Sequence, residues 1–399
     1  MAHTFFRNLQ GGIRNPQSAI HNPFVPSRLR AFAFVGLVAF PAFSFAQRAE
    51  SPPRSTTTLA KQQQVVFQHA VRAIAPSIVR IDTIGGAQPV RRETSVQQQR
   101  IAPGFRQADG PTTGLIWSPD GYILTSSFNF ARDPVIITVM LSDGRRYVAR
   151  LIARDLPARL ALLKIDAADL PAPQWVDSDH LCAGQWVLAA GLGHGTDEPA
   201  VSVGILSALR RMSGQAVQTD AKISPANYGG PLFDVEGRVI GICVPMGPGE
   251  DELAGVEWYD SGIGFAIHHD HIRRRAPRLQ QGQDLRRGLL GVFFDPHEPV
   301  VALGAGAGET GAPPTVEGLR IVGEARGPAA EVGLKAGDVV THIDDEPTPR
   351  LVDFRRVVAH KAAGDTIKVS YRRGDRTAVI TLQLAAAEDF RLSPALQPR

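Results

Sequence analysis

Imidazole and carboxylate groups are concentrated in one short segment, His268-His269-Asp270-His271. On a helix, the side chains of His268 and His271 would be neighbours, and neighbouring imidazoles can share a metal ion. The same pattern is also typical of a solvated polar helix start that follows an apolar strand. We favour that second interpretation, with Arg273-Arg274-Arg275 as a solvated helix face, and we expect no metal and no cofactor.

Two other features suggest chemistry only weakly. Gly304–Gly308 has the composition of a phosphate-binding loop but lacks the Gly-Lys-Ser/Thr ending, so we expect a flexible loop. Cys182 and Cys243 are the only cysteines, and both lie in apolar, strand-like runs. An exported protein could pair them. We favour two buried, unpaired thiols.

The chain has 399 residues, of which 43% are hydrophobic and 21% are charged. This length and composition indicate a globular protein of more than one domain, whose elements would position such residues.

The formal net charge of the chain is +4. Residues 1–46 contain four arginines and no acid, so the remainder is balanced. A protein that binds phosphate backbones needs a surplus basic face. We therefore expect no nucleic acid as a partner.

The N-terminal region has the layout of an export signal. Arg28 and Arg30 precede an apolar run, Ala31–Phe45, and a small-x-small pattern then ends at Ala46. The run is shorter than the ~20 residues that span a bilayer. We predict a signal peptide over residues 1–46 and a periplasmic or secreted protein; the alternative is a retained N-terminal anchor facing the periplasm. The Pro-, Ser- and Thr-rich residues 47–58 are predicted to form a linker.

The body of the chain predicts mainly β structure. A helical rhythm covers residues 59–75, and residues 85–110 have the low apolar content of a long loop. From 113 to 267, short apolar runs alternate with turn signals such as Ser118-Pro119-Asp120-Gly121, which is typical of an all-β barrel or sandwich. Residues 59–281 are thus one predicted β-rich domain. Residues 282–388 mix strands with a helix at 351–363, and residues 389–399 form a tail.

Several motifs in order resemble the HtrA (DegP-like) serine proteases. They are Gly114–Thr125, Leu160–Ile165, Tyr228–Ile242 and Gly262–Ile267, followed by Gly288–Val292, Ala329–Val340 and Phe354–Val358. The resemblance covers roughly residues 60–387. It implies a chymotrypsin-like double β-barrel followed by an α+β PDZ domain.

The same resemblance implies that the catalytic positions are replaced. The family's histidine falls at Phe128, its aspartate at Arg159 and its serine at Tyr228. The oxyanion loop, Gly-Asn-Ser-Gly-Gly in the family, begins here with Ala226 and Asn227. A triad needs a nucleophile, a base and an anion that orients the base. Phenylalanine accepts no proton, arginine is a permanent cation, and a phenol is a poor nucleophile. The resemblance therefore implies a pseudoprotease.

A displaced triad is the alternative. Nearby hydroxyl and carboxyl groups belong to Ser126, Ser127, Ser224 and Asp155, and candidate bases in other segments are His180, His194 and His268. A rescue requires base and nucleophile within about 3 Å of each other. We favour the loss of activity over this alternative.

The resemblance further implies that the PDZ domain captures peptide C-termini. Backbone N–H groups of Leu289, Leu290, Gly291 and Val292 would bind the terminal carboxylate, the peptide would add as a strand beside Val292 to Phe294, and Phe354 and Val358 would line the side-chain pocket. The alternative is that these apolar residues form only the core of the domain.

We expect a protein that binds peptides or unfolded proteins and scaffolds or regulates protein quality control in the envelope. Alternatives are an active endopeptidase and a structural envelope component. Family members form trimers through N-terminal segments, so Phe67 is an expected contact in a homo-trimer or in an assembly with an active homologue.

Overall fold

The computed structural model describes residues 54–84, 111–130, 133–193, 197–247, 259–294, 301–302, 316–387 and 389. The predicted signal peptide or anchor, the loop at 85–110, the glycine-rich run at 304–308 and most of the tail lie outside these residues. Within the described part, no helix is both long and apolar enough to cross a bilayer.

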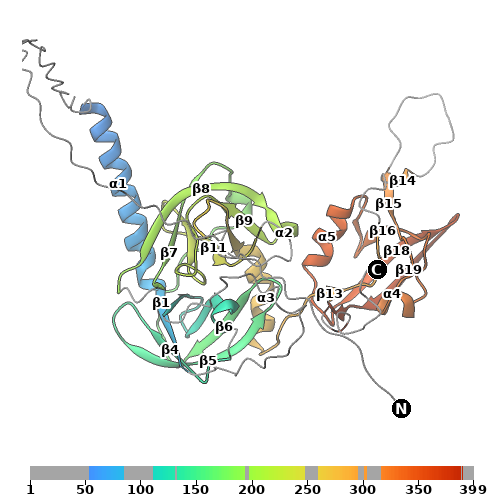
Figure 1. Ribbon diagram of the computed structural model, residues 1–399, viewed down its shortest axis with the longest axis horizontal. Helices are drawn as coiled ribbons and strands as arrows, with labels where there is room; N and C mark the ends of the chain where they lie inside the picture. Colours follow the sequence, from blue (N-terminus) through green and yellow to red (C-terminus); the bar gives the residue numbers. More distant parts are fainter. Residues whose placement is uncertain are drawn as a thin grey trace, which may run out of the picture. The chain divides into compact units, whose positions relative to one another are not determined.

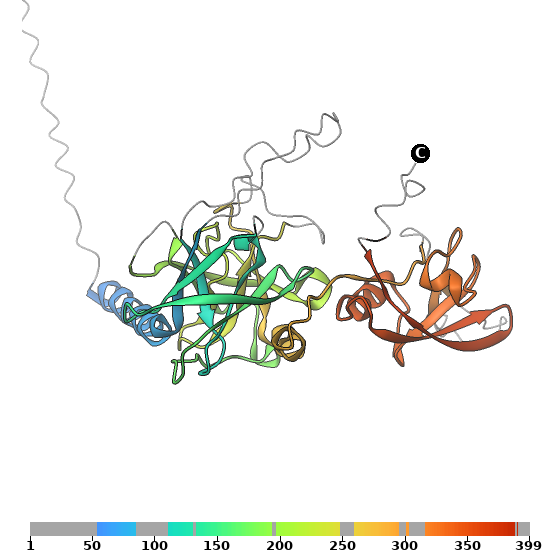
Figure 2. The same ribbon diagram turned by 90° about the horizontal axis from the view of Figure 1, so that it is seen from below.

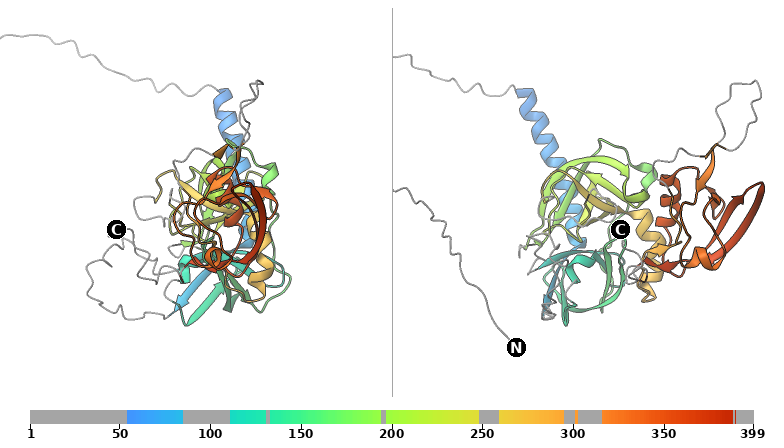
Figure 3. Two further views of the ribbon diagram at one scale, coloured as in Figure 1. Left: turned by 90° about the vertical axis from the view of Figure 1, so that its right-hand side faces the viewer. Right: turned by 45° about the vertical axis from the view of Figure 1, so that its right-hand side comes forward.

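The first element, α1 (Arg54–Ile74), is an amphipathic helix. It begins within the predicted linker 47–58, because Pro52 and Pro53 precede it and nothing after them disrupts a helix. Ala70 and Ile74 are fully buried, whereas Leu59 and Val65 are exposed. Only the C-terminal part of α1 therefore packs on the barrels (Figures 1 and 3). The short helix η1 (Ala75–Ser77), with Pro76 in its first turn, follows.

Two six-stranded antiparallel barrels follow, which confirms the predicted mainly-β double barrel. The first closes in the order β1-β2-β3-β6-β5-β4, and the second in the order β10-β11-β12-β9-β8-β7. The strands of the first barrel are β1 (Ile78–Ile84), β2 (Thr112–Ile116), β3 (Tyr122–Ser126), β4 (Ile136–Met140), β5 (Arg146–Asp155) and β6 (Leu160–Ile165). Those of the second are β7 (Trp186–Gly191), β8 (Ala200–Arg210), β9 (Ala216–Thr219), β10 (Pro231–Asp234), β11 (Val239–Val244) and β12 (Gly264–His268).

Alternating apolar residues build the barrel cores. Ile81, Ile123 and Leu163 belong to a cluster inside the first barrel. Leu115 and Leu124 join a larger cluster that also holds Phe233 of the second barrel. The hairpin between β2 and β3 turns at Gly121, whose φ of 99° suits glycine. The two barrels thus share a buried apolar interface, and the loops at its edge carry the candidate site.

Helix α3 (His269–Gln280) follows β12, as predicted. The α+β region after it contains a sheet in the order β14-β15-β16-β18-β19, with β17 paired to β16, and a separate pair of β13 and β20 (Figures 1 and 2). Its elements are β13 (Gly288–Leu289), β14 (Val301–Ala302), β15 (Val316–Arg320), α4 (Pro328–Glu331), β16 (Val339–Ile343), β17 (Glu346–Pro347), α5 (Leu351–Ala359), β18 (Thr366–Arg373), β19 (Arg376–Gln383) and β20 (Ala385–Ala386). This is the PDZ-like arrangement that the sequence predicts.

Three details differ from the sequence predictions. The apolar pattern from Leu289 to Phe294 predicts one strand, but β13 ends at Leu289, and Gly291 in the middle of the run adopts a φ of 89°, which a strand does not accommodate. Strand β9, whose sequence is Ala-Val-Gln-Thr, has too few apolar residues for its pattern to predict a strand. Helix α5 ends at Ala359 rather than at residue 363.

The burial of several polar residues also differs. His268 and His271 are 7% and 1% exposed, so they are not the solvated helix start that we expected. Arg275 is buried as well, because its guanidinium binds Asp155. Both cysteines are free, as expected, but Cys182 is exposed and lies outside the strands.

Candidate functional site

The candidate catalytic positions lie at the edge where the two barrels meet. Phe128 belongs to the 3-10 helix η2 (Ser127–Phe130), which directly follows β3, and Tyr228 lies on the turn before β10. Their rings pack edge to face, with centroids 5.6 Å apart. Tyr259 adds a second edge contact to Tyr228 at 6.3 Å. The predicted base and nucleophile positions are therefore joined by an aromatic cluster.

The Tyr228 side chain is part of the hydrophobic core. It is 2% exposed and packs in one cluster with Phe128, Val187 and Leu232. Burial raises the pKa of the Tyr228 phenol well above its ordinary value, because the apolar surroundings disfavour the phenolate. A nucleophilic oxygen anion is therefore strongly disfavoured here.

Asn129 fixes the aromatic pair through the backbone. Its side-chain amide donates hydrogen bonds to the hydroxyl of Thr125 at 3.1 Å and to the carbonyl of Tyr228 at 3.4 Å. The Thr125 hydroxyl in turn donates to the carbonyl of Thr113. This network ties η2 to the turn that carries Tyr228.

The backbone of Arg159 lies near the same edge of the two barrels. It adopts a left-handed φ of 59° at the end of a turn closed by its N–H and the carbonyl of Leu156. Its carbonyl accepts hydrogen bonds from the Ser127 N–H at 2.8 Å and the Ser126 hydroxyl at 3.2 Å. The position expected to hold an orienting carboxylate is thus adjacent to η2 but carries a guanidinium.

The turn at residues 224–230 retains a tightly determined backbone. The Asn227 side chain accepts a hydrogen bond from the Ser224 N–H, and the Ala226 carbonyl accepts hydrogen bonds from the Gly193 N–H and the Thr113 hydroxyl. Gly229 has a φ of 89°, and a Cβ there would lie 2.3 Å from the carbonyl oxygen of Thr113. The backbone of this turn, where the resemblance places the oxyanion loop, is therefore held in one conformation.

The candidates for a displaced triad do not come together. Among the described residues, no histidine nitrogen hydrogen-bonds to the hydroxyl of Ser126, Ser127, Ser224 or Tyr228. His268 contacts the carbonyl of Gly214, and Asp155 binds Arg275. Burial raises the pKa of Asp155, while Arg275 opposes that shift. His180 lies on the short helix η3 (Ser178–His180), and His194 lies outside the described residues.

The predicted peptide-binding residues share one pocket. All seven line a cavity of about 460 Å³: Leu289, Leu290, Gly291, Val292, Phe294, Phe354 and Val358. Met212 and Met246 of the second barrel line it too. The rings of Phe294 and Phe354 make an edge contact at 4.8 Å.

The backbone at Gly291 leaves no room for a side chain. A Cβ at Gly291 would lie 1.9 Å from the carbonyl oxygen of Arg326, whose N–H donates to the Gly291 carbonyl. Leu290 is buried beneath the loop. Close packing of the loop against the backbone at Arg326 therefore requires glycine at position 291.

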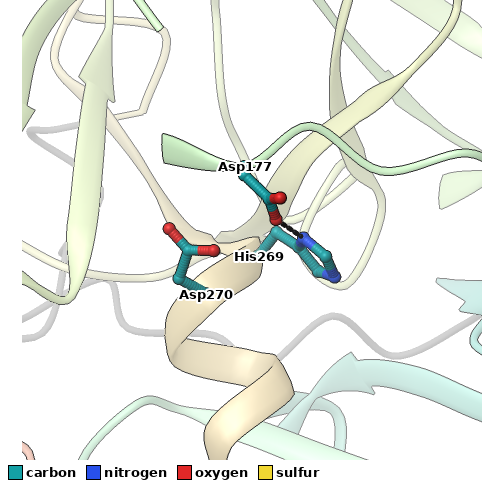
Figure 4. A group of neighbouring side chains, drawn as sticks. All are labelled: Asp177, His269 and Asp270. Atoms are coloured by element: carbon teal, nitrogen blue, oxygen red, sulfur yellow. Dashed lines mark hydrogen bonds and ion pairs between the residues drawn. The ribbon is translucent and has the colours of Figure 1, made fainter. Parts of the chain in front are cut away.

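A group of potential metal ligands lies at the start of α3. Asp177, His269 and Asp270 bring their ligand atoms within 4.8 Å of one another (Figure 4). Asp177 accepts a hydrogen bond from His269 at 3.1 Å, and the Arg273 guanidinium lies within 3.6 Å of Asp177 and 3.3 Å of Asp270. Arg273 therefore supplies the positive charge that a metal would bring, and the donor set does not fit an additional cation.

Tyr259, Asn129 and Thr113 are site residues that the sequence reasoning missed. Asn129 directly follows Phe128, and this adjacency was the only local signal available. Tyr259 and Thr113 reach the site through long-range packing and hydrogen bonds, which no local pattern encodes.

Comparisons with known proteins agree with this architecture. Residues 112–242 match a trypsin-like peptidase domain, and residues 288–384 match a PDZ domain. The chain is 32% identical over 341 residues to a probable periplasmic serine endoprotease, DegP-like, from Pseudomonas fulva, covering 78% of this chain and 68% of the relative. A protein of the same description from Pseudomonas putida F1 is 30% identical over 359 residues, covering 86% and 72%.

A solved structure, the HtrA-type protease AlgW with tripeptide, is 29% identical with a TM-score of 0.61; the match covers 80% of this chain and 96% of that chain. The same protease with a decapeptide gives a TM-score of 0.59 over 80% of this chain and 98% of that chain. Each of these two matches covers 80% of this chain in one solved structure.

Proposed function

Because the chain belongs to the HtrA/DegP-like family of trypsin-fold proteases with a C-terminal PDZ domain, we propose that it is a member without peptidase activity that binds peptides or unfolded proteins. The observation that carries the proposal is the buried edge contact between Phe128 and Tyr228. This contact occupies the positions where the resemblance puts the base and the nucleophile. We propose 59–281 and 282–388 as the bounds of the two domains.

The chemistry of the three replaced positions supports inactivity. Peptide hydrolysis by a serine protease needs proton transfer from the nucleophile to a base and stabilisation of the resulting cation. Phe128 has no atom that accepts a proton, and the Arg159 guanidinium would repel a charged base. Loss of the complete triad lowers kcat by about 10⁶-fold in the analogous deletion series.

The pocket at Gly291 supports the binding role. The left-handed backbone at Gly291 and the apolar side chains of Phe294 and Phe354 suit an extended peptide with an apolar C-terminal side chain. AlgW, to which this chain is similar, has been solved with a tripeptide and with a decapeptide. We propose that this groove is the ligand site of the chain.

The same family membership supports proposals for the location and the assembly of the chain. The DegP-like relatives are described as periplasmic, and we propose the periplasm for this chain, with an N-terminal anchor as the alternative. We further propose a homo-trimer, or an assembly with an active homologue, through the α1 region. Phe67 packs there against Trp186, with centroids 5.7 Å apart.

The test compares hydrolysis of unfolded casein by the purified chain, by Tyr228→Ala and by a restored variant that combines Phe128→His, Arg159→Asp and Tyr228→Ser. We expect no turnover by the first two. Turnover by the wild type that is lost in Tyr228→Ala would overturn the proposal. Turnover by the restored variant alone would localise the defect to these three positions, whereas its inactivity would leave the wild-type result as the deciding one.

A further inference from the structure

A second, cationic pocket lies beside the candidate sites and has no role in the proposed function. It has a volume of about 980 Å³ and is formed by the turn α2 (Arg211–Gly214), the start of α3 and the helix α5. Five arginines and two histidines line it: Arg210, Arg211, Arg274, Arg350, Arg356, His268 and His360. The lining carboxylates are Asp179, Asp270 and Asp353.

Most of that negative charge is already engaged. Asp353 accepts two hydrogen bonds from Arg350, at 2.8 and 2.9 Å. Asp270 accepts hydrogen bonds from the Ser178 N–H and from Arg273, which lies outside the pocket lining. The carboxylates therefore do not neutralise the remaining arginines.

Three guanidinium groups of the pocket have no counter-ion among the residues that the structure describes. In the described ranges, Arg210, Arg211 and Arg274 form no ion pair within 4.0 Å. The Arg211 guanidinium lies over the ring of Phe265, and its Nε is buried with no hydrogen-bond partner. A buried charged donor without a partner is costly, so it indicates a site that a ligand would complete.

The same pocket also offers acceptors. His268 donates through Nε2 to the carbonyl of Gly214 at 2.8 Å, so its Nδ1 carries a lone pair when the ring is neutral. That Nδ1 is buried with no hydrogen-bond partner, 3.9 Å from Asp270, and the Nδ1 of His360 is likewise unpartnered. The pocket therefore combines cationic donors with a neutral acceptor.

We propose that this pocket binds the hydrogen-phosphate form of a phosphate group, with its oxygens accepting from arginine and its O–H donating to His268. Guanidinium groups match phosphate geometry and bind it through paired hydrogen bonds. A phosphate whose second pKa is about 6 to 7 still presents an O–H donor near neutral pH. Sulfate has the same shape and no proton to donate, so the lone pair of His268 would favour phosphate over sulfate.

The variants that test this pocket leave the fold in place. Arg210 adopts a φ of 56°, a conformation that asparagine tolerates, and Arg274 is exposed on α3. The test variant is therefore Arg210→Asn with Arg274→Gln. Arg278→Gln is the matched control, because it removes one cation from the same helix outside the pocket lining, and its partner Asp365 does not line the pocket either.

Isothermal titration of the purified full chain with inorganic phosphate, and in parallel with sulfate, is the experiment. We expect phosphate to bind at least about tenfold more tightly than sulfate, the double variant to lose about tenfold or more in affinity, and Arg278→Gln to stay within about twofold of wild type. No heat of binding, equal affinity for sulfate, or unchanged affinity in the double variant would overturn the proposal.

Two further arms identify the source of the phosphate. Glycerol 3-phosphate tests a small phosphate ester, and vesicles containing phosphatidic acid test a lipid headgroup. Binding of the soluble ester at the affinity of inorganic phosphate or better supports a free metabolite, and vesicle binding that the double variant abolishes supports a headgroup. None of these measurements uses peptide binding or hydrolysis, so the outcome is independent of the proposed function.

Discussion

Two glycine-containing loops, one on the barrels and one on the PDZ domain, have opposite surroundings. The loop at Gly229 is covered by Tyr228, Phe128 and the hydrogen bonds of Asn129. The loop at Gly291 lines an open pocket of about 460 Å³. Both need glycine, because a Cβ would strike a backbone oxygen at either position. Two loops can thus have the same backbone requirement for glycine, while a neighbouring side chain determines whether a ligand can reach each loop.

The largest effect on peptide binding is expected from a substitution in the loop that contains Gly291. In Gly291→Ala, the new Cβ would lie 1.9 Å from the Arg326 carbonyl at a φ of 89°, so the loop must shift. We expect loss of detectable binding of a peptide with an apolar C-terminus, measured by fluorescence anisotropy. A circular-dichroism melt checks that the domain remains folded. Wild-type affinity in this variant would remove the loop from the binding site.

A substitution in the loop that contains Gly229 should change the stability of the protein and not its peptidase activity. Tyr228→Ala removes a fully buried ring and should lower the free energy of unfolding by about 3–5 kcal/mol without producing hydrolysis. Denaturant unfolding measures this change. Tyr228→Phe is the control and should cost less than about 1.5 kcal/mol, since the ring is kept. A stable Tyr228→Ala variant with peptidase activity would contradict the claim that the loop at Gly229 supports only stability.

A smaller effect is expected from one side chain of the open pocket. Phe354→Ala removes an apolar wall and an aromatic contact with Phe294, so we expect peptide affinity to fall by about tenfold or more. Val352 lies on the same helix, is 56% exposed and does not line this pocket. Val352→Ala should therefore bind peptide like the wild type, and equal losses in both variants would contradict a specific role for Phe354.

The smallest effect is a pH dependence of stability. Burial, with Arg274 and Arg275 nearby, lowers the pKa of His360 to about 4, and burial holds that of His271 well below its ordinary value. Unfolded histidine titrates near pH 6.5, so the unfolded state takes up protons first. Stability is then full above about pH 6.5 and declines as the pH falls toward about 4.

Chemical denaturation between pH 7.5 and pH 4.5 measures this dependence. His360→Gln should flatten the decline, because it removes one group that gains a proton only on unfolding. An identical slope in the variant would show that His360 does not contribute.

The mainly-β body of the chain could be predicted because apolar runs separated by turn residues are local patterns. The double barrel and the candidate site residues were predicted from the resemblance to a protease family instead. The burial of His271 and Arg275 was not predictable, since it depends on Asp155, which lies on β5, far away in sequence. Likewise, the resemblance places the family's serine position at Tyr228, but only the fold shows that Phe128 and Tyr259 pack against this ring.

The most direct measurement determines, for one peptide, both whether it binds and whether it is cleaved. A peptide with an apolar C-terminus is incubated with a saturating excess of the purified chain, its bound fraction is read by anisotropy, and its mass is read by mass spectrometry over many hours. The account predicts a fully bound and fully intact peptide. Cleavage that proceeds in the wild type and stops in Tyr228→Ala would contradict it.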